Sequence, residues 1–364
     1  MQDGVLPMWV ADMDFGTLPV VTQTLENNMS HSFFGYSEVK DRYFNAVRTW
    51  FKTRFEFEAE VKWIVRTPGV LFALAMAICA YTEKGDSVMI QPPVYHQFKN
   101  LIQKNNRKLV INPLVYNNGK YYIDFVDFEE KIRENNVKLF IFCSPHNPVG
   151  RVWTKDEIIC LGKICLKYNC IVFSDEINCD VVLYKKSHVV FSTAYESLKN
   201  ISIIATSPSK AFNLAGLQVA NIFVPDDVLR AKIKLEIAKA GVVRPNILGL
   251  LACQSVYEDG TDWMVSLIEY LNKNVELVDS FISKKMPKIR LIKPEATYLI
   301  WLDFSALRLP QETLNFLVTN VAKVWLLDGA LFGEQGIGFM RMNIACPRKT
   351  LKNALVRLSD VIPK

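Results

Sequence analysis

The sequence lacks the features that mark membrane-spanning, secreted and zinc-binding proteins. No apolar run reaches the roughly 18 to 20 residues needed to cross a bilayer, and the first residues, Met-Gln-Asp-Gly, do not resemble a signal peptide. The eight cysteines never form a Cys-x-x-Cys pair and lie mainly in apolar segments, which argues against a zinc site and a disulfide framework. These absences predict a soluble, cytoplasmic protein with reduced thiols.

Long stretches of one charge sign, internal repeats and low-complexity segments are missing as well. The formal net charge of +6 is spread over pairs such as Lys185 and Lys186, which we interpret as solvated surface and not as a nucleic-acid site. The chain has 364 residues, of which 50% are hydrophobic. It can therefore bury a large core, and we expect two domains.

The segment from Ser207 to Gly216 is the most informative part of what the sequence does contain. It directly follows the apolar run Ile201–Ala205, so Lys210 lies where a buried strand is expected to leave a sheet. The hydroxyls of Ser207 and Ser209 suit a phosphate, and a lysine beside a phosphate subsite is what a Schiff base with pyridoxal phosphate requires. A polar loop with an exposed lysine is the alternative that these residues alone leave open.

Two further expected strands end in polar residues. The strand Leu139–Cys143 leads to Asn147, and the strand Cys170–Phe173 leads to Asp175. Between them, Thr154 and Glu157 form a capping box for a helix that ends near Tyr168. Parallel strands separated by helices have their carboxyl ends at one edge of a sheet, so we expect Asn147, Asp175 and Lys210 to converge there.

Two upstream segments point to the same edge. The turn before Gly69 is followed by an alanine-rich run, Val70–Tyr81, which predicts a buried helix whose first amides can hold a phosphate. A tight turn without a ligand fits these residues equally well. After the expected strand Ser87–Gln91, a helix is predicted to begin at Pro92, which places Tyr95 at the strand's carboxyl end.

The C-terminal part has the pattern of a smaller α+β unit. Within it, Arg341 interrupts an apolar strand, and its guanidinium must find an anion, either a protein carboxylate or that of a ligand. The other strands are expected at Lys108–Ile111, Val219–Val224, Ile289–Ile292, Tyr298–Leu302 and Val324–Leu327. The other helices are expected at Pro19–Met29, Arg42–Phe55, Val126–Asn135, Asp226–Lys239, Ile247–Tyr257, Trp263–Lys284, Gln311–Val321 and Pro347–Leu358.

Five motifs together resemble those of the fold-type I pyridoxal phosphate enzymes, in particular the branch of cystathionine β-lyases and cysteine-S-conjugate β-lyases related to MalY and PatB. The resemblance runs from Val5 to the C-terminus. The motifs are Met-Trp-Val-Ala-Asp-Met-Asp-Phe (8–15), Ser-Pro-His-Asn-Pro-Val-Gly-Arg (144–151), Ser-Asp-Glu-Ile (174–177), Ser-Pro-Ser-Lys-Ala-Phe-Asn-Leu-Ala-Gly-Leu-Gln (207–218) and Arg-Met-Asn-Ile-Ala-Cys-Pro-Arg (341–348).

The resemblance implies an α/β fold of the aspartate aminotransferase type. A large domain would contain a mixed, mostly parallel seven-stranded sheet, and a smaller domain would be α+β. The implied boundaries are an N-terminal segment at 1–37 that contributes to the small domain and the site entrance, the large domain at 38–258, and the small domain at 259–364. A homodimer with active sites between the subunits is also implied, with no nucleic-acid or membrane partner.

The resemblance further implies a cofactor, pyridoxal 5'-phosphate, and its contacts. Lys210 would form the Schiff base and later move the substrate α-proton, and Asp175 would pair with the pyridine nitrogen. The remaining contacts would be Asn147 to the phenolic oxygen, Tyr95 on the ring face, and Ser207, Ser209 and the amides of Val70 and Leu71 to the phosphate. Asn178 stands where related aminotransferases usually have tyrosine and these lyases usually histidine, so the bond to the phenolic oxygen is expected to differ.

The substrate contacts and the reaction follow from the same resemblance. Arg341 would bind the substrate α-carboxylate with help from Ala11 and Asp12, and Tyr36 would enter the neighbouring subunit's site. The implied reaction is β-elimination from cystathionine or another cysteine S-conjugate, which gives a thiol, pyruvate and ammonia. An aminotransferase on the same fold is the alternative, and a role in binding regulators is a third possibility.

Overall fold

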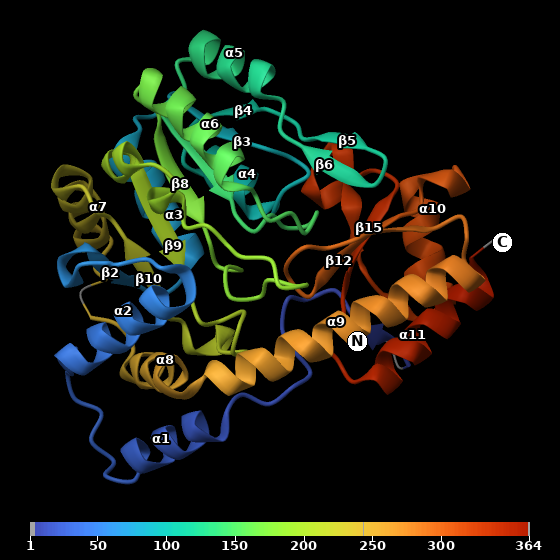
Figure 1. Cartoon of the computed structure of the whole chain (residues 1–364), viewed down its shortest axis with the longest axis horizontal. Helices are drawn as coiled ribbons and strands as arrows, with labels where there is room; N and C mark the ends of the chain where they lie inside the picture. The colour runs from blue at the N-terminus through green and yellow to red at the C-terminus, as the bar shows by residue number, and fades with distance from the viewer. Residues whose placement is uncertain (1–3, 243, 363–364) are drawn as a thin grey trace.

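The computed structural model describes residues 4–242 and 244–362 of the chain. Two sheets and the helices around them form its two sides, and the long helix α9 (Thr261–Lys285) crosses from one side to the other (Figure 1). The N-terminal strand β1 (Leu6–Pro7) pairs with β13 (Val324–Trp325), so the beginning of the chain lies against its C-terminal part. Residues from both ends can therefore contribute to one site.

The larger sheet has seven strands in the order β2-β10-β9-β8-β7-β3-β4. Only β10 runs antiparallel to its neighbours. The mixed, mostly parallel seven-stranded sheet is thereby confirmed. Its strands are β2 (Ile64–Thr67), β3 (Ser87–Ile90), β4 (Lys108–Ile111), β7 (Leu139–Cys143), β8 (Ile171–Asp175), β9 (Ser202–Thr206) and β10 (Ala220–Phe223).

Two hydrophobic cores lie on the two faces of this sheet. Along β7, Leu139 and Ile141 belong to one core, whereas Phe140 and Phe142 belong to the other, as the two-residue period of a strand requires. One core includes side chains of α3 (Val70–Tyr81), α4 (Gln97–Lys104) and α7 (Asp227–Lys239). The other includes side chains of α1 (Pro19–Met29), α2 (Asp41–Phe55), α5 (Phe125–Asn135), α6 (Lys155–Lys167) and α8 (Ile247–Asp259).

The second sheet has four antiparallel strands in the order β11-β12-β15-β14. Its central strand β15 carries Arg341. The strands are β11 (Arg290–Ile292), β12 (Leu299–Asp303), β14 (Leu327–Asp328) and β15 (Phe339–Asn343), and the helices beside them are α9, α10 (Gln311–Phe316) and α11 (Arg348–Val361). A hairpin is formed by β5 (Val115–Asn117) and β6 (Lys120–Tyr122). The two domain boundaries, after residues 37 and 258, stay a prediction.

Most of the expected elements begin and end within about three residues of the observed ones, but three differ more strongly. The helix expected from Pro92 begins only at Gln97, because Pro93 disfavours a helical backbone at the residue before it and the Val94 amide bonds to the Phe332 carbonyl. The strand expected at 324–327 is divided between β13 and β14, which pair in different sheets. The helix expected from Gln311 is α-helical only to Phe316 and continues to Val321 as a π-helix.

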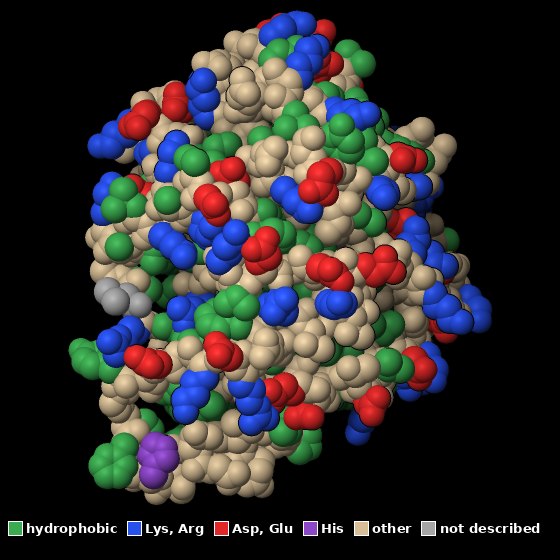
Figure 2. Space-filling model, turned by 60° about the vertical axis from the view of Figure 1, so that its left-hand side comes forward, with side chains coloured by type: hydrophobic (Ala, Val, Ile, Leu, Met, Phe, Trp, Pro, Cys, Tyr) green, Lys and Arg blue, Asp and Glu red, His purple; other side chains and the backbone are tan. Residues whose placement is uncertain are grey.

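The outer surface mixes the two charge signs. On the face drawn in Figure 2, basic and acidic side chains alternate without a continuous basic patch. Among the described residues, no helix combines the length and apolar character that spanning a bilayer requires.

Candidate active site

The site lies at the edge of the large sheet where β7, β8 and β9 end. These strands are adjacent and parallel, and Asp175 pairs in register with Cys143 on one side and Ala205 on the other. The loops after β7 and β9 carry Asn147 and Lys210. All three side chains line one cavity of about 500 Å³. The expected convergence of Asn147, Asp175 and Lys210 is therefore confirmed.

The cavity gathers nearly all of the residues expected to form the site. Those that line it are Ala11, Val70, Leu71, Tyr95, Asn147, Asp175, Asn178, Ser207, Ser209, Lys210 and Arg341. Asp12 is exposed and does not line the cavity, although its charge partly opposes the desolvation that lowers the pKa of Lys210. Tyr36 is 91% exposed and lies under the guanidinium of Arg244, 4.7 Å from the ring centroid.

Lys210 is partly buried and points into the site. Its Nζ donates a hydrogen bond to the Ala11 carbonyl at 2.8 Å, an oxygen that also accepts from the Tyr298 hydroxyl at 2.9 Å. Desolvation lowers the pKa of Lys210, and the positive charge of Arg341 acts in the same direction. A lowered pKa makes the neutral, nucleophilic amine more accessible near neutral pH. The alternative of an exposed lysine on a polar loop is wrong.

Asp175 is a buried carboxyl that forms no ion pair with any residue in the described ranges. Burial raises its pKa to about 7, while the hydrogen bond from the Ile177 amide opposes that shift. Ionisation of Asp175 is therefore costly until a positive group arrives. A protonated ring nitrogen is a group of the required charge.

A buried pair that the sequence analysis missed lies directly behind Asp175. The carboxylate of Glu176 contacts His188 Nε2 at 2.7 Å and accepts hydrogen bonds from the Ser174 hydroxyl and the Phe191 amide. Both side chains of the Glu176–His188 pair are fully buried. These contacts fix the end of β8. The local sequence around Glu176 does not reveal them, because His188 and Phe191 lie 12 and 15 residues further along the chain.

Arg341 reaches the cavity from the four-stranded sheet. Its side chain is buried, and the guanidinium donates to Asn147 Oδ1 at 3.1 Å and to the Trp9 carbonyl at 2.8 Å. Its Nε has no hydrogen-bond partner among the described residues. Burial lowers the pKa of Arg341 to about 10. Because its partners are neutral oxygens, the guanidinium retains the capacity to bind an anionic ligand.

The first turn of α3 brings uncapped backbone amides to the cavity. Residues 68–71 line it, no side chain caps the helix, and a side chain added at Gly69 would meet open space. Such a helix start attracts a phosphate. The Ser207 hydroxyl already donates to the Val219 carbonyl at 2.7 Å and accepts from the Ser209 amide at 3.1 Å. Its contact to a phosphate stays a prediction.

Several residues that complete the site could not be inferred from local sequence. Trp9 lines the cavity mouth and stacks on Trp325 at 4.9 Å, and His96 and Leu331 lie at the same cavity. Asn213 holds the N-terminal segment in place through three hydrogen bonds to the backbone of Met13 and Phe15.

Within residues 4–242 and 244–362, no group of three potential metal ligands is present.

Comparison with known proteins identifies the family. Residues 4–358 match the family described as aminotransferase class I and II. The chain belongs to this family. It is 40% identical to cystathionine β-lyase PatB of Bacillus subtilis, covering 98% of this chain and 92% of that protein. Protein MalY of Escherichia coli is 30% identical, with 98% and 92% covered.

Solved structures of the family agree with the fold. The pyridoxal phosphate-bound C-S lyase of Staphylococcus hominis superimposes with a TM-score of 0.94 at 32% identity, over 99% of this chain and 92% of that one. The expected fold of the aspartate aminotransferase type and the expected place in the MalY and PatB branch are thereby confirmed.

Proposed function

We propose that the protein is a pyridoxal phosphate-dependent C–S β-lyase that cleaves cystathionine or a related cysteine S-conjugate into a thiol, pyruvate and ammonia. One observation carries the proposal. A single cavity collects a lysine with a lowered pKa, a buried carboxyl and a buried arginine with a free donor. The similarity to PatB and to a C-S lyase supports the choice of reaction.

The residues of the cavity fit the cofactor. Asp175 would hold the proton of the ring nitrogen, the first amides of α3 would hold the phosphate, and the Lys210 amine would carry the aldehyde carbon. Tyr95 and Asn147 line the same cavity. Bound pyridoxal phosphate supplies an electron sink for the carbanion that forms at the substrate α-carbon.

The side chains of the chain position the substrate and move its proton. Arg341 would bind the α-carboxylate through its fork of donors, which fixes the α-carbon relative to Lys210. Once the substrate amine had taken its place on the aldehyde carbon, the freed neutral amine of Lys210 would remove the α-proton as a general base. The leaving thiolate would face the cavity mouth, where Trp9 and Leu331 present apolar surface.

An assay of products distinguishes the lyase from an aminotransferase of the same fold. We expect the purified holoenzyme with cystathionine, and without any keto acid, to release pyruvate and free thiol in equal amounts. The Lys210→Ala variant should release neither, because it lacks the base. Formation of a new amino acid from an added keto acid, without pyruvate or thiol, would contradict the lyase and favour the aminotransferase.

We further propose that the protein is a cytoplasmic homodimer in which Tyr36 reaches the neighbouring subunit's site. The segment before α2 supports an interface, because Phe33 is 82% exposed, Phe34 63% and Tyr36 91% in the single chain. Three large aromatic side chains exposed within four residues are unusual for a surface that stays in contact with water.

A further inference from the structure

Two side chains of the site stand on different sheets. Asn147 belongs to the loop 144–151 after β7 of the seven-stranded sheet, and Arg341 lies on β15 of the four-stranded sheet. Their side chains are joined by a single hydrogen bond of 3.1 Å. Any contact that fixes one sheet relative to the other therefore also sets the distance between the Arg341 guanidinium, which we propose binds the α-carboxylate, and the Asn147 amide.

The backbone of the Asn147 loop is joined directly to the segment that enters β12. The Gly150 carbonyl accepts hydrogen bonds from the amides of Glu295 at 2.7 Å and Ala296 at 3.1 Å. Gly150 has a φ of +70°, and a Cβ there would approach Pro294 Cβ to 2.9 Å. The two segments are thus packed too closely for any side chain at position 150.

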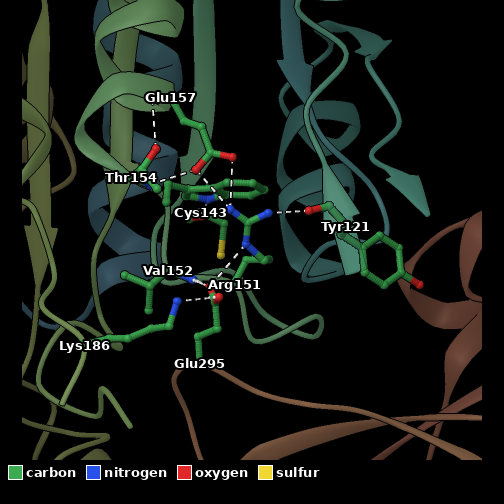
Figure 3. Close-up of polar contacts among 9 residues, drawn as sticks. Tyr121, Cys143, Arg151, Val152, Thr154, Glu157, Lys186 and Glu295 are labelled. Atoms are coloured by element: carbon green, nitrogen blue, oxygen red, sulfur yellow. Dashed lines mark hydrogen bonds and ion pairs between the residues drawn. The ribbon is translucent and has the colours of Figure 1, made fainter. Parts of the chain in front are cut away.

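Arg151 is the ionic centre of this junction (Figure 3). Its side chain is buried, and Nε contacts Glu295 Oε2 at 3.2 Å while Nη2 contacts the two oxygens of Glu157 at 2.9 and 3.0 Å. Nη1 donates to the Tyr121 carbonyl. The guanidinium also lies over the Trp153 ring, 4.6 Å from its centroid. One cation therefore serves two carboxylates from different parts of the chain.

The two carboxylates differ in where they come from. Glu157 lies on α6 beside the seven-stranded sheet and completes the capping box with Thr154. Glu295 lies between β11 and β12 of the four-stranded sheet, and it also accepts from the Val152 amide at 2.9 Å and from Lys186 Nζ at 2.7 Å. Of the two carboxylate contacts of Arg151, only the one to Glu295 connects the side of the seven-stranded sheet to that of the four-stranded sheet, beside the backbone hydrogen bonds of Gly150. Neither Arg151 nor Glu295 lines the cavity.

We propose that the Arg151–Glu295 ion pair is a positioning device that holds the α-carboxylate clamp Arg341 at a fixed distance from Asn147. A buried guanidinium shared between both sheets resists their relative displacement, because any movement would leave charges unpaired away from water. Loss of the pair should loosen substrate binding through Arg341. The identity of the ligand as an amino acid rests on the proposed function.

Glu157 provides a matched control within the same ion cluster. Glu295→Gln and Glu157→Gln each remove one carboxylate charge from the same guanidinium, but only the first change removes the ion pair between the two sheets. We expect Glu295→Gln to raise KM for cystathionine about tenfold with a smaller change in kcat, as misplacement of a substrate-holding group predicts. Glu157→Gln should lower Tm and leave KM near the wild-type value.

A second measurement does not depend on turnover. L-alanine has the α-carboxylate but no leaving group, so its binding can be followed through the visible absorbance of the holoenzyme. We expect Glu295→Gln to weaken alanine binding about as much as it raises KM. If the wild type bound alanine tightly and Glu295→Gln did not, yet cystathionine gave no pyruvate, the proposed reaction would fail while the positioning role would stand.

Two outcomes would overturn the positioning role. One is an equal rise in KM for both variants, and the other is a lowered Tm of Glu295→Gln with unchanged KM and alanine binding. If Glu295→Gln does not fold, Glu295→Asp takes its place, because it keeps the charge but shortens the reach by one methylene. An unaltered KM and alanine affinity in Glu295→Asp, with a lowered Tm, would equally reject the proposal.

Discussion

At the residue scale, Asp175 shows how a site prepared for a charged ligand destabilises the protein without that ligand. Its carboxyl has a pKa of about 7 instead of 3.8, chiefly because burial removes it from water. The folded chain therefore binds the proton more tightly than the unfolded chain does. The cofactor-free protein should lose stability as the pH rises from about 4 to about 7, and the loss should then stay constant.

We predict that Asp175→Asn stabilises the cofactor-free protein at pH 8, by up to about 4 kcal/mol, because the amide cannot ionise. The Asn side chain can still accept the Ile177 hydrogen bond that the carboxyl accepts. Tm measured from pH 5 to 8 tests this expectation, and the difference between variant and wild type should narrow toward pH 5. A difference that does not depend on pH would show that ionisation of Asp175 is not its cause.

At the scale of elements, Asn213 connects two distant segments. It lies in the loop after β9 with a φ of +57°, and its side chain forms three hydrogen bonds of 3.0 to 3.1 Å to the segment 13–15. The same N-terminal segment supplies the Trp9 carbonyl to Arg341 and the Ala11 carbonyl to Lys210. The Asn213 side chain thus holds in place the backbone segment whose carbonyls accept hydrogen bonds from both Arg341 and Lys210.

Asn213→Gly should lower the free energy of unfolding by about 2 to 3 kcal/mol, at roughly 1 kcal/mol for each hydrogen bond lost. It should also raise KM, because the backbone partners of Arg341 and Lys210 would no longer be held. Urea unfolding and steady-state kinetics measure the two effects. The control is Asn118→Gly, since Asn118 also has a positive φ, 49°, but lies in the β5–β6 turn. A KM change shared by both variants would contradict this role of Asn213.

At the scale of the whole molecule, a single chain leaves Tyr36 outside the cavity that it is proposed to complete. Tyr36 does not line the cavity and is 91% exposed. In an assembly with two-fold symmetry, the segment 33–36 of each chain would contact the other chain. Sedimentation of the wild type should therefore give the mass of two chains.

Mixing two inactive variants tests whether the subunits share sites. In a heterodimer of Lys210→Ala and Tyr36→Ala chains, one site receives both intact residues and the other receives neither. We expect refolding of an equal mixture to restore about a quarter of the wild-type activity, since about half of the dimers are mixed and each has one intact site. If the activity stayed at the level of the separate variants, Tyr36 would act in the site of its own chain or would have no role in catalysis.

The sequence alone predicted the elements whose ends carry local signals. Gly69 marked the start of α3, and the pair Thr154 and Glu157 marked the start of α6, as the observed capping box confirms. The convergence of Asn147, Asp175 and Lys210 was predictable because parallel strands share one edge. The five motifs predicted the family, which the comparisons confirm.

The tertiary structure decided what depends on partners distant in sequence. The residues near Trp325 form two short strands because β13 pairs with β1 near the N-terminus, whereas β14 pairs with β15 in the C-terminal part. Local sequence could not tell whether Arg341 meets a protein carboxylate or a ligand, and only the fold surrounds it with neutral oxygens. The sequence by itself thus determined that Asn147, Asp175 and Lys210 gather at one edge of the large sheet. The fold alone determined their environment, since burial and long-range contacts set charge, pKa and distance.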